Sequence, residues 1–173
     1  DSWNKRTLTP ETMPHVYRFA TESQWYDNHF SCSNGTRTSI FGLFFSVPGH
    51  YWDSFVPSHV SPVFIDELLT EGYQLRIHGS ATFVDPPFAS AIFQRVPHLQ
   101  ISTPGATTYD RDRCITNDFI RELPTLKQKA PFFAFLFYDL AHSFEYPKKL
   151  PKKFTPSWDY ADYTRLSNDT DPT

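Results

Sequence analysis

The feature that most constrains the fold of this chain is a run of seven apolar residues at positions 132–138. Pro131 precedes the run and Asp139 follows it. A run of this length without polar interruption suits a central strand that is buried on both faces. Strands of this kind occur in parallel sheets that helices cover on both sides, so the run favours an α/β fold.

Helix-like and strand-like segments alternate along the rest of the chain. Ser61 and Pro62 suit the start of a helix, and Gly72 suits its end. Pro124 is expected to kink or split the helix that contains it. Apolar spacing predicts helices at residues 13–23, 39–45, 61–71, 88–93 and 114–129, and strands at residues 25–30, 73–78, 98–101 and 132–138. This alternation predicts α/β layering around a largely parallel sheet.

A cluster of small hydroxyl residues surrounds Gly35, just before the expected helix of residues 39–45. Gly35 allows a sharp backbone turn, and the helix start offers free N–H groups and a positive dipole end to an anion. Two interpretations stay open. The cluster is an ordinary helix cap, or it presents a Ser or Thr nucleophile to a phosphate or sulfate ester.

Composition limits the classes of partner. A chain of 173 residues with a net charge of −3 and no basic stripe is expected to form one domain that binds no nucleic acid. No run of about 18 apolar residues is present, which is the length that would cross a membrane. A small basic cluster is formed by the lysines at positions 148, 149, 152 and 153. It is either a solvated surface turn or a contact site for an anionic headgroup.

The chain reads as a fragment of a longer protein, because Asp1 resembles the end of a first core strand whose body is missing. Asp1, Thr36, His78 and His142 each follow an expected strand. Ligands of parallel sheets bind beyond the carboxyl ends of the strands, so these four residues form the candidate constellation. Cys32 and Cys114 lack the spacing of a zinc site, and they are either a disulfide pair or two unrelated thiols.

The sequence resembles the sulfatase-like proteins of the alkaline phosphatase superfamily, and most closely the branch of YejM/PbgA-type inner-membrane proteins. Lipoteichoic acid synthases and phosphoethanolamine transferases are more distant relatives. The resemblance covers nearly the whole chain. The residues that carry it are Asp1-Ser2-Trp3, Met13-Pro14, His29-Phe30, Asn34-Gly35-Thr36, Ile40-Phe41-Gly42-Leu43-Phe44-Phe45, Tyr51-Trp52, Gly72-Tyr73, Pro131-Phe132-Phe133 and His142.

The resemblance implies a three-layer sandwich with a divalent metal, which could be Mn²⁺, Mg²⁺, Zn²⁺ or Ca²⁺. Asp1 resembles the acidic metal ligand, and Thr36 resembles the nucleophile that also contacts the metal. His142 resembles a histidine that holds substrate oxygens. His78 occupies a place similar to another substrate-side histidine, in a different local sequence. Arg37 is expected to help balance the charge of the ester oxygens.

Two departures from the family pattern limit what the chain can do. No Asp-His-Gly motif for the remaining metal ligands occurs in it. Residues 1–173 are therefore expected to be the N-terminal portion of the domain, with transmembrane helices upstream and the other metal ligands downstream. Cys32 does not begin a Cys-x-Pro-x-Arg sequence, which is the signal for conversion of the cysteine to formylglycine, so a formylglycine sulfatase is disfavoured.

Two functions from different classes follow from the resemblance. The first is a metal-dependent hydrolase or phosphotransferase that uses a Thr nucleophile to act on a phosphate or sulfate ester. This enzyme would be a membrane-anchored domain at the periplasmic face of the bacterial inner membrane. The alternative is a catalytically silent envelope regulator that binds lipopolysaccharide or acidic lipid.

Overall fold

The structure is a computed structural model that describes residues 7–26, 28–126, 128 and 130–143. The chain divides into two compact units, Asp1–Ser31 and Cys32–Thr173. In the first unit, helix α1 (Pro14–Thr21) begins with Pro14 in its first turn, where a missing N–H costs nothing. This helix confirms the one expected at residues 13–23. Asp1 and the basic cluster of residues 148–153 lie outside the described residues.

The strand expected at residues 25–30 is wrong. Residues 25, 26 and 28–30 form no strand, and the Tyr26 and Phe30 side chains are 69% and 82% exposed. Alternating aromatic residues predict a half-buried strand only where a neighbouring strand and a core are available to cover one face. The described residues of the first unit offer this segment neither.

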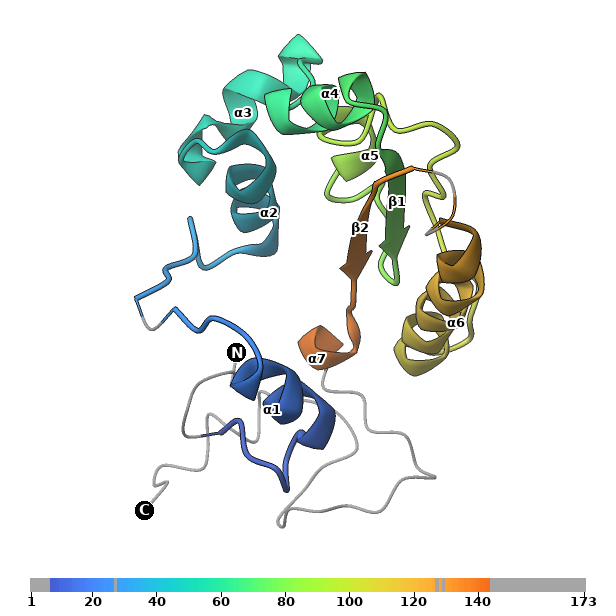
Figure 1. The fold of residues 1–173 in the computed structure, drawn as a ribbon. Coiled ribbons are helices and arrows are strands. Elements are labelled where there is room, and N and C mark those ends of the chain that lie inside the picture. The colour runs from blue at the N-terminus through green and yellow to red at the C-terminus, as the bar shows by residue number, and fades with distance from the viewer. Residues whose placement is uncertain (1–6, 27, 127, 129, 144–173) are drawn as a thin grey trace. The chain divides into compact units, whose positions relative to one another are not determined.

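The second unit is built on two parallel strands, β1 (Gln74–Gly79) and β2 (Phe132–Phe137). They pair in register, with Gln74 opposite Phe132 and Gly79 opposite Phe137 (Figure 1). Parallel strands require a long crossover connection, and here the crossover contains helices α5 (Phe88–Ala91) and α6 (Thr108–Leu126). The expectation of a parallel sheet is confirmed for these two strands.

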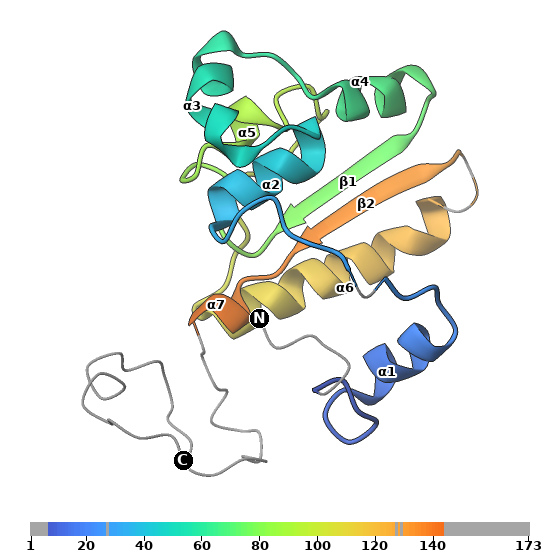
Figure 2. The same ribbon diagram turned by 90° about the vertical axis from the view of Figure 1, so that its left-hand side faces the viewer.

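Helices cover both faces of this small sheet (Figure 2). Helix α2 (Thr36–Phe45) lies on one face with α4 (Val63–Thr70) and α5, and α6 lies on the other. The Phe44 ring of α2 contacts Phe133 and Phe135, whereas the Phe119 ring of α6 contacts Phe132. Successive strand residues point to opposite faces, so both faces of β2 carry an apolar layer. The unit is a mixed α/β structure.

The main core lies between the sheet and the helices on the α2 face. Short elements complete this side of the unit: η1 (Gly49–Tyr51), α3 (Trp52–Phe55) and η2 (Val56–Ser58). The buried core side chains are Phe41, Phe44, Trp52, Ile65, Leu75, Ile77, Phe83, Phe88, Ala91, Ile92, Phe93 and Val96. All six residues of β2 are only half-buried, contrary to the expectation of full burial, because β1 is its sole partner among the described strands.

Glycine ends helix α4 as expected. Gly72 has a φ of +75°, a left-handed conformation that glycine adopts without strain. The Gly72 N–H donates to Leu69 O at 3.2 Å, and the Tyr73 N–H donates to Leu68 O at 2.9 Å. These two bonds form a Schellman motif, which satisfies the last carbonyls of the helix and turns the chain into β1.

Three details of the expected elements are wrong. The N-cap residue of α4 is Pro62 rather than Ser61, whose buried hydroxyl has no hydrogen-bond partner among the described residues. Helix α6 begins at Thr108 rather than at residue 114, and it continues through Pro124 to Leu126, so of the two expected effects of Pro124 the split does not occur. Residues 98–101 form no strand, because His98 has a φ of +55°, which interrupts an extended backbone.

Candidate active site at the carboxyl end of the sheet

Hydrogen bonds among hydroxyl groups hold the turn that precedes α2. The Thr38 hydroxyl donates to Ser33 Oγ at 2.7 Å, and the Ser39 hydroxyl donates to Ser33 O at 2.7 Å. The Gly35 N–H also donates to Ser33 Oγ, at 3.3 Å. Gly35 itself has a φ of −111° and a ψ of 141°, which any residue adopts, so the turn does not depend on glycine as expected.

Thr36 is the first residue of α2 and is exposed. The described residues offer its hydroxyl no hydrogen-bond partner, in contrast to Ser33, Thr38 and Ser39 around it. The first N–H groups of a helix have no partner within the helix and attract anions. The N-cap residue of α2 is Gly35, which makes no side-chain cap hydrogen bond, so the interpretation of the cluster as an ordinary hydroxyl cap is wrong. The hydroxyls of Thr38 and Ser39 bond to Ser33 instead, and Thr36 is left available for a ligand.

The start of α2 lies at the end of the unit toward which the arrowheads of β1 and β2 point (Figures 1 and 2). Helix α7 (Leu140–Ser143), which follows β2, lies at the same end. In parallel α/β structures ligands bind at this end of the sheet. Thr36 and the helix that carries His142 are thus placed where the fold presents a ligand site.

Gly49 holds the hydroxyl turn against the body of the unit. A Cβ atom at Gly49 would lie 2.5 Å from Thr38 Cβ and 2.9 Å from Thr38 O. At Gly35 the nearest atom to such a Cβ would be Thr38 Oγ1 at 3.5 Å. The two glycines therefore differ in how much room they leave.

Gly49→Ala is expected to lower the free energy of unfolding by about 1–3 kcal/mol, because the backbone at Thr38 must move. Gly35→Ala is the control and is expected to change it by less than about 1 kcal/mol, because alanine is a poorer N-cap residue than glycine but meets no steric clash there. Urea unfolding of the two variants measures the difference. Equal stability of the two variants would show that Gly49 does not pack tightly against Thr38.

Arg37 lies over an aromatic ring rather than free in solvent. Its guanidinium carbon is 5.8 Å from the centroid of the Trp52 ring, within the range of a cation–π contact. Trp52 is buried, so the ring that the guanidinium contacts belongs to the core. Arg37 directly follows Thr36 in the sequence, and it is exposed.

His142 is exposed on α7, and its N–H donates to Asp139 O at 3.0 Å. The start of this short helix is fixed from α6. Asp112 Oδ1 accepts the Asp139 N–H at 3.1 Å, and Asp112 Oδ2 accepts the Leu140 N–H at 3.2 Å. His142 therefore projects from a turn that another helix holds in place.

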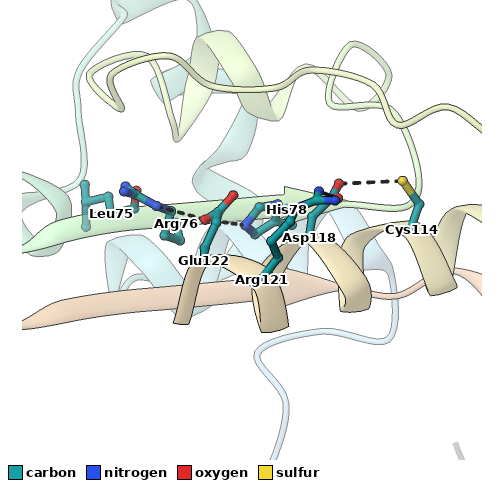
Figure 3. A network of polar contacts seen from close by, with 7 residues as sticks. All are labelled: Leu75, Arg76, His78, Cys114, Asp118, Arg121 and Glu122. Atoms are coloured by element: carbon teal, nitrogen blue, oxygen red, sulfur yellow. Dashed lines mark hydrogen bonds and ion pairs between the residues drawn. The ribbon is translucent and has the colours of Figure 1, made fainter. Parts of the chain in front are cut away.

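His78 lies within β1 rather than after it, and it faces α6. The side chain is 8% exposed, and its Nε2 is 3.6 Å from Glu122 Oε2 (Figure 3). Its ring also makes an edge-type contact with the ring of Phe119. Arg76 Nε lies 3.0 Å from the same Glu122 oxygen, as an ion pair without hydrogen-bond geometry. The structure thus groups His78 with Arg76 and Glu122 between β1 and α6.

The helix that carries Thr36 packs on the opposite face of the sheet. Leu75 and Ile77 point into the core beneath α2, so His78, one position further, points to the other face. A cavity of about 540 Å³ runs between β1, residues 96–100 and Glu122, and His78 lines it, whereas Thr36 and His142 do not. The structure does not bring His78 together with the other candidate residues.

Both cysteines are free thiols. Cys32 is exposed, and Cys114 is half-buried on α6 with its Sγ 3.6 Å from Asp118 Oδ2. Burial, reinforced by the negative charge of Asp118, raises the pKa of the Cys114 thiol. Of the two interpretations of the cysteines, the structure agrees with two unrelated thiols.

Comparison with known proteins adds the evidence for the family. The family model described as Sulfatase matches residues 3–171, which is nearly the whole chain. The chain belongs to the sulfatase family. The sulfatase-like proteins lie within the alkaline phosphatase superfamily, so the resemblance drawn from the motifs is confirmed.

Relatives of this sulfatase-family chain come from Gram-negative bacteria. It is 32% identical over 136 residues to an uncharacterized protein of Haemophilus influenzae, covering 78% of this chain and 22% of that protein. It is 30% identical over 96 residues to the inner membrane protein YejM of Salmonella typhimurium, covering 56% of this chain and 16% of that protein. The chain therefore spans about a fifth of the length of these relatives. None of its described helices is long and apolar enough to cross a membrane.

The described residues of this sulfatase-family chain do not form a metal site by themselves. Family members are typically metal-dependent. No group of three or more His, Cys, Asp or Glu residues gathers in a metal-binding arrangement within the part of the chain that the structure describes. Thr36 supplies one oxygen donor there, whereas Mg²⁺ or Ca²⁺ takes about six or more ligands. Asp1, the expected acidic ligand, is not among the described residues.

Two acidic side chains of α6 make contacts that the sequence interpretation missed, Asp112 with the start of α7 and Glu122 with His78 and Arg76. Asp112 and Glu122 are acidic residues on the face of α6 that also carries Ile115 and Phe119. An acidic residue at helical spacing from buried apolar residues needs a partner, because an unpaired buried charge is costly. That spacing was the available signal for both residues.

Proposed function

We propose that this chain is part of a sulfatase-like hydrolase or phosphotransferase that attacks a phosphate or sulfate ester with the Thr36 hydroxyl. The observation that carries the proposal is the exposed Thr36 hydroxyl, which has no partner among the described residues and stands at the start of α2. Membership of the sulfatase family supports ester chemistry at this position.

The reaction divides into two displacements. Thr36 Oγ1 forms a bond to phosphorus or sulfur while the bond to the ester oxygen breaks. The Thr36 proton passes to solvent, and the leaving oxygen takes up a proton. Water or an acceptor hydroxyl then displaces Thr36 and restores its O–H, so that the choice between water and acceptor separates a hydrolase from a transferase.

Charge on the ester oxygens needs donors that are already in position. The first N–H groups of α2 have no partner within the helix, and they are one source of such donors beside Thr36. His142 is the second source, from α7 at the same end of the sheet. Arg37 is the third, and its guanidinium contacts the Trp52 ring.

A divalent cation belongs to this proposal as an expectation from the family. When bound, it would lower the pKa of a ligating hydroxyl and offset ester charge. Thr36 and Asp1 are the residues of this chain proposed to contact it. Its remaining ligands would come from parts of the protein outside this chain. The similarity to the inner membrane protein YejM supports a place at the inner membrane, and the periplasmic face is part of the proposal.

The proposal is tested by trapping the covalent intermediate. The full-length protein is incubated with 4-nitrophenyl phosphate, quenched in acid and digested for mass spectrometry. We expect the peptide that contains Thr36 to gain one phosphoryl group, located on Thr36 by fragmentation. Thr38, two residues on, is the internal control, because its hydroxyl is engaged by Ser33. A phosphoryl group found only on another residue would reject Thr36 as the nucleophile.

The alternative function is an envelope regulator that binds lipopolysaccharide or acidic lipid and performs no catalysis. Its support is the similarity to a protein named as an inner membrane protein. Metal analysis and vesicle binding separate the two functions. A stoichiometric metal that chelators remove together with turnover favours the enzyme. Absence of turnover with both phosphate and sulfate esters, combined with binding to vesicles that contain acidic lipid, favours the regulator.

A further inference from the structure

We propose that Asp112 is a positioning residue for His142, acting through the first residues of α7. This inference rests on the proposed function, because it assigns a partner to a residue of the same site. Asp112 is remote in sequence from α7 and lies on α6, yet its carboxylate reaches the backbone at the start of that helix.

The contact uses both oxygens of the carboxylate. Oδ1 accepts the Asp139 N–H at 3.1 Å and Oδ2 accepts the Leu140 N–H at 3.2 Å, so two adjacent peptide units are held as a fork. Asp112 is 8% exposed and forms no ion pair with the described residues. Hydrogen bonds from N–H groups to an ionised acceptor are stronger than hydrogen bonds between neutral groups. Among the described residues, these two bonds offset the cost of burying the Asp112 charge.

A second contact one turn further along α6 holds the same segment. Thr116 Oγ1 donates to Asp112 O at 2.8 Å, so it is left to accept from the Tyr138 hydroxyl, 2.9 Å away. Residues 138, 139 and 140 are thus all tied to α6. His142 follows two residues later, and its own N–H donates to Asp139 O.

Arg111, next to Asp112 on α6, holds the loop that follows the other strand, β1. Arg111 Nε donates to Ser80 O at 3.0 Å, immediately after β1, and Arg111 Nη2 donates to Thr108 Oγ1 at 3.0 Å. The first turns of α6 therefore hold the loops at the carboxyl ends of both strands. Only one of these loops leads to a candidate site residue, which is why the inference is confined to Asp112.

Asp112→Asn tests the fork. The amide keeps the size of the side chain but has one acceptor oxygen, and its NH₂ group would face an N–H donor. We expect kcat/KM of the full-length protein for 4-nitrophenyl phosphate to fall about 10- to 100-fold, which is the cost of misplacing a group near the reacting atoms. Asp118→Asn is the matched control, since it makes the same change on the same helix, at a residue that pairs with Arg121. It is expected to change kcat/KM by less than about threefold.

A double-mutant cycle separates positioning from general stability. If Asp112 acts through His142, then Asp112→Asn costs little once His142→Ala is present, because the group that it positions is gone. We therefore expect the double variant to be within about threefold of His142→Ala alone. Additive losses in kcat/KM would overturn the inference, since they would show that Asp112 acts elsewhere.

Tyr138→Phe provides the test if Asp112→Asn fails to fold. It removes one exposed hydroxyl from the same segment, and we expect a smaller loss of kcat/KM that also disappears in the His142→Ala background. Activity unchanged by both Asp112→Asn and Tyr138→Phe, alongside a loss in His142→Ala, would overturn the positioning role and leave the proposed function intact. Activity unchanged by Thr36→Val would reject the proposed function, and the inference with it.

Discussion

Replacing Thr36 by valine in the full-length protein is expected to lower kcat/KM for 4-nitrophenyl phosphate and 4-nitrophenyl sulfate by at least about 10³-fold. Valine has the branched shape of threonine and lacks only the oxygen that forms the new bond. Because the described residues make no hydrogen bond to the Thr36 hydroxyl, its removal breaks no structural contact among them. The loss would therefore be chemical, and the free energy of unfolding should change by less than about 0.5 kcal/mol.

The neighbouring hydroxyls make this prediction specific. Thr36→Ser retains a nucleophilic oxygen and is expected to keep measurable turnover. Thr38→Val, in contrast to Thr36→Val, is expected to lower the free energy of unfolding, because the Thr38 hydroxyl donates to Ser33 Oγ at 2.7 Å and holds the turn. Initial rates and urea unfolding of the three variants distinguish chemistry from structure. Wild-type turnover in Thr36→Val would show that the nucleophile is another group.

The elements that could be predicted from sequence are those whose signal is local. The run at residues 132–138 specified β2, because so apolar a segment has to lie in a covered sheet. Gly72 specified the end of α4, because the left-handed conformation there favours glycine. Both signals act over a few residues and do not depend on what packs nearby.

The wrong predictions concern segments whose structure depends on distant partners. Residues 25–30 alternate as a strand does, but alternation reports only that one face could be covered. Ser61 has the right chemistry for a cap, yet its hydroxyl is buried and the helix begins after Pro62. In each case the tertiary environment, which no local pattern contains, decided the outcome.

The candidate site was predicted in part. The turn at Thr36 could be read from the sequence because its hydroxyls and the following helix are contiguous. The face of the sheet on which His78 lies could also be predicted from the sequence. Leu75 and Ile77 are apolar and His78 is out of phase with them, so strand alternation places His78 on the other face. The contact from Asp112 to Asp139 was not available, since it joins the side chain of one residue to the backbone N–H of another 27 positions away.

Phe44→Ala is expected to lower the free energy of unfolding by about 3–5 kcal/mol, the range for truncating a buried Phe. Phe44 is 2% exposed, and its ring centroid lies 5.0 Å from that of Phe93 and 5.2 Å from that of Phe135. The ring thus joins α2 to the sheet. Since domains are stable by about 5–15 kcal/mol in total, this one substitution removes a large share of stability.

Leu43 provides the matched control for Phe44, as the adjacent apolar residue on the same helix. Leu43 is 60% exposed, so Leu43→Ala is expected to cost less than about 1 kcal/mol. Phe44→Leu is expected to fall between the two, because it keeps apolar volume but loses the edge-to-face ring contacts, which contribute about 0.5–1.5 kcal/mol each. Urea unfolding of the three variants gives this order. If Phe44→Ala were no more damaging than Leu43→Ala, α2 would not be anchored through Phe44, and the position of Thr36 at the carboxyl end of the sheet would lose its structural basis.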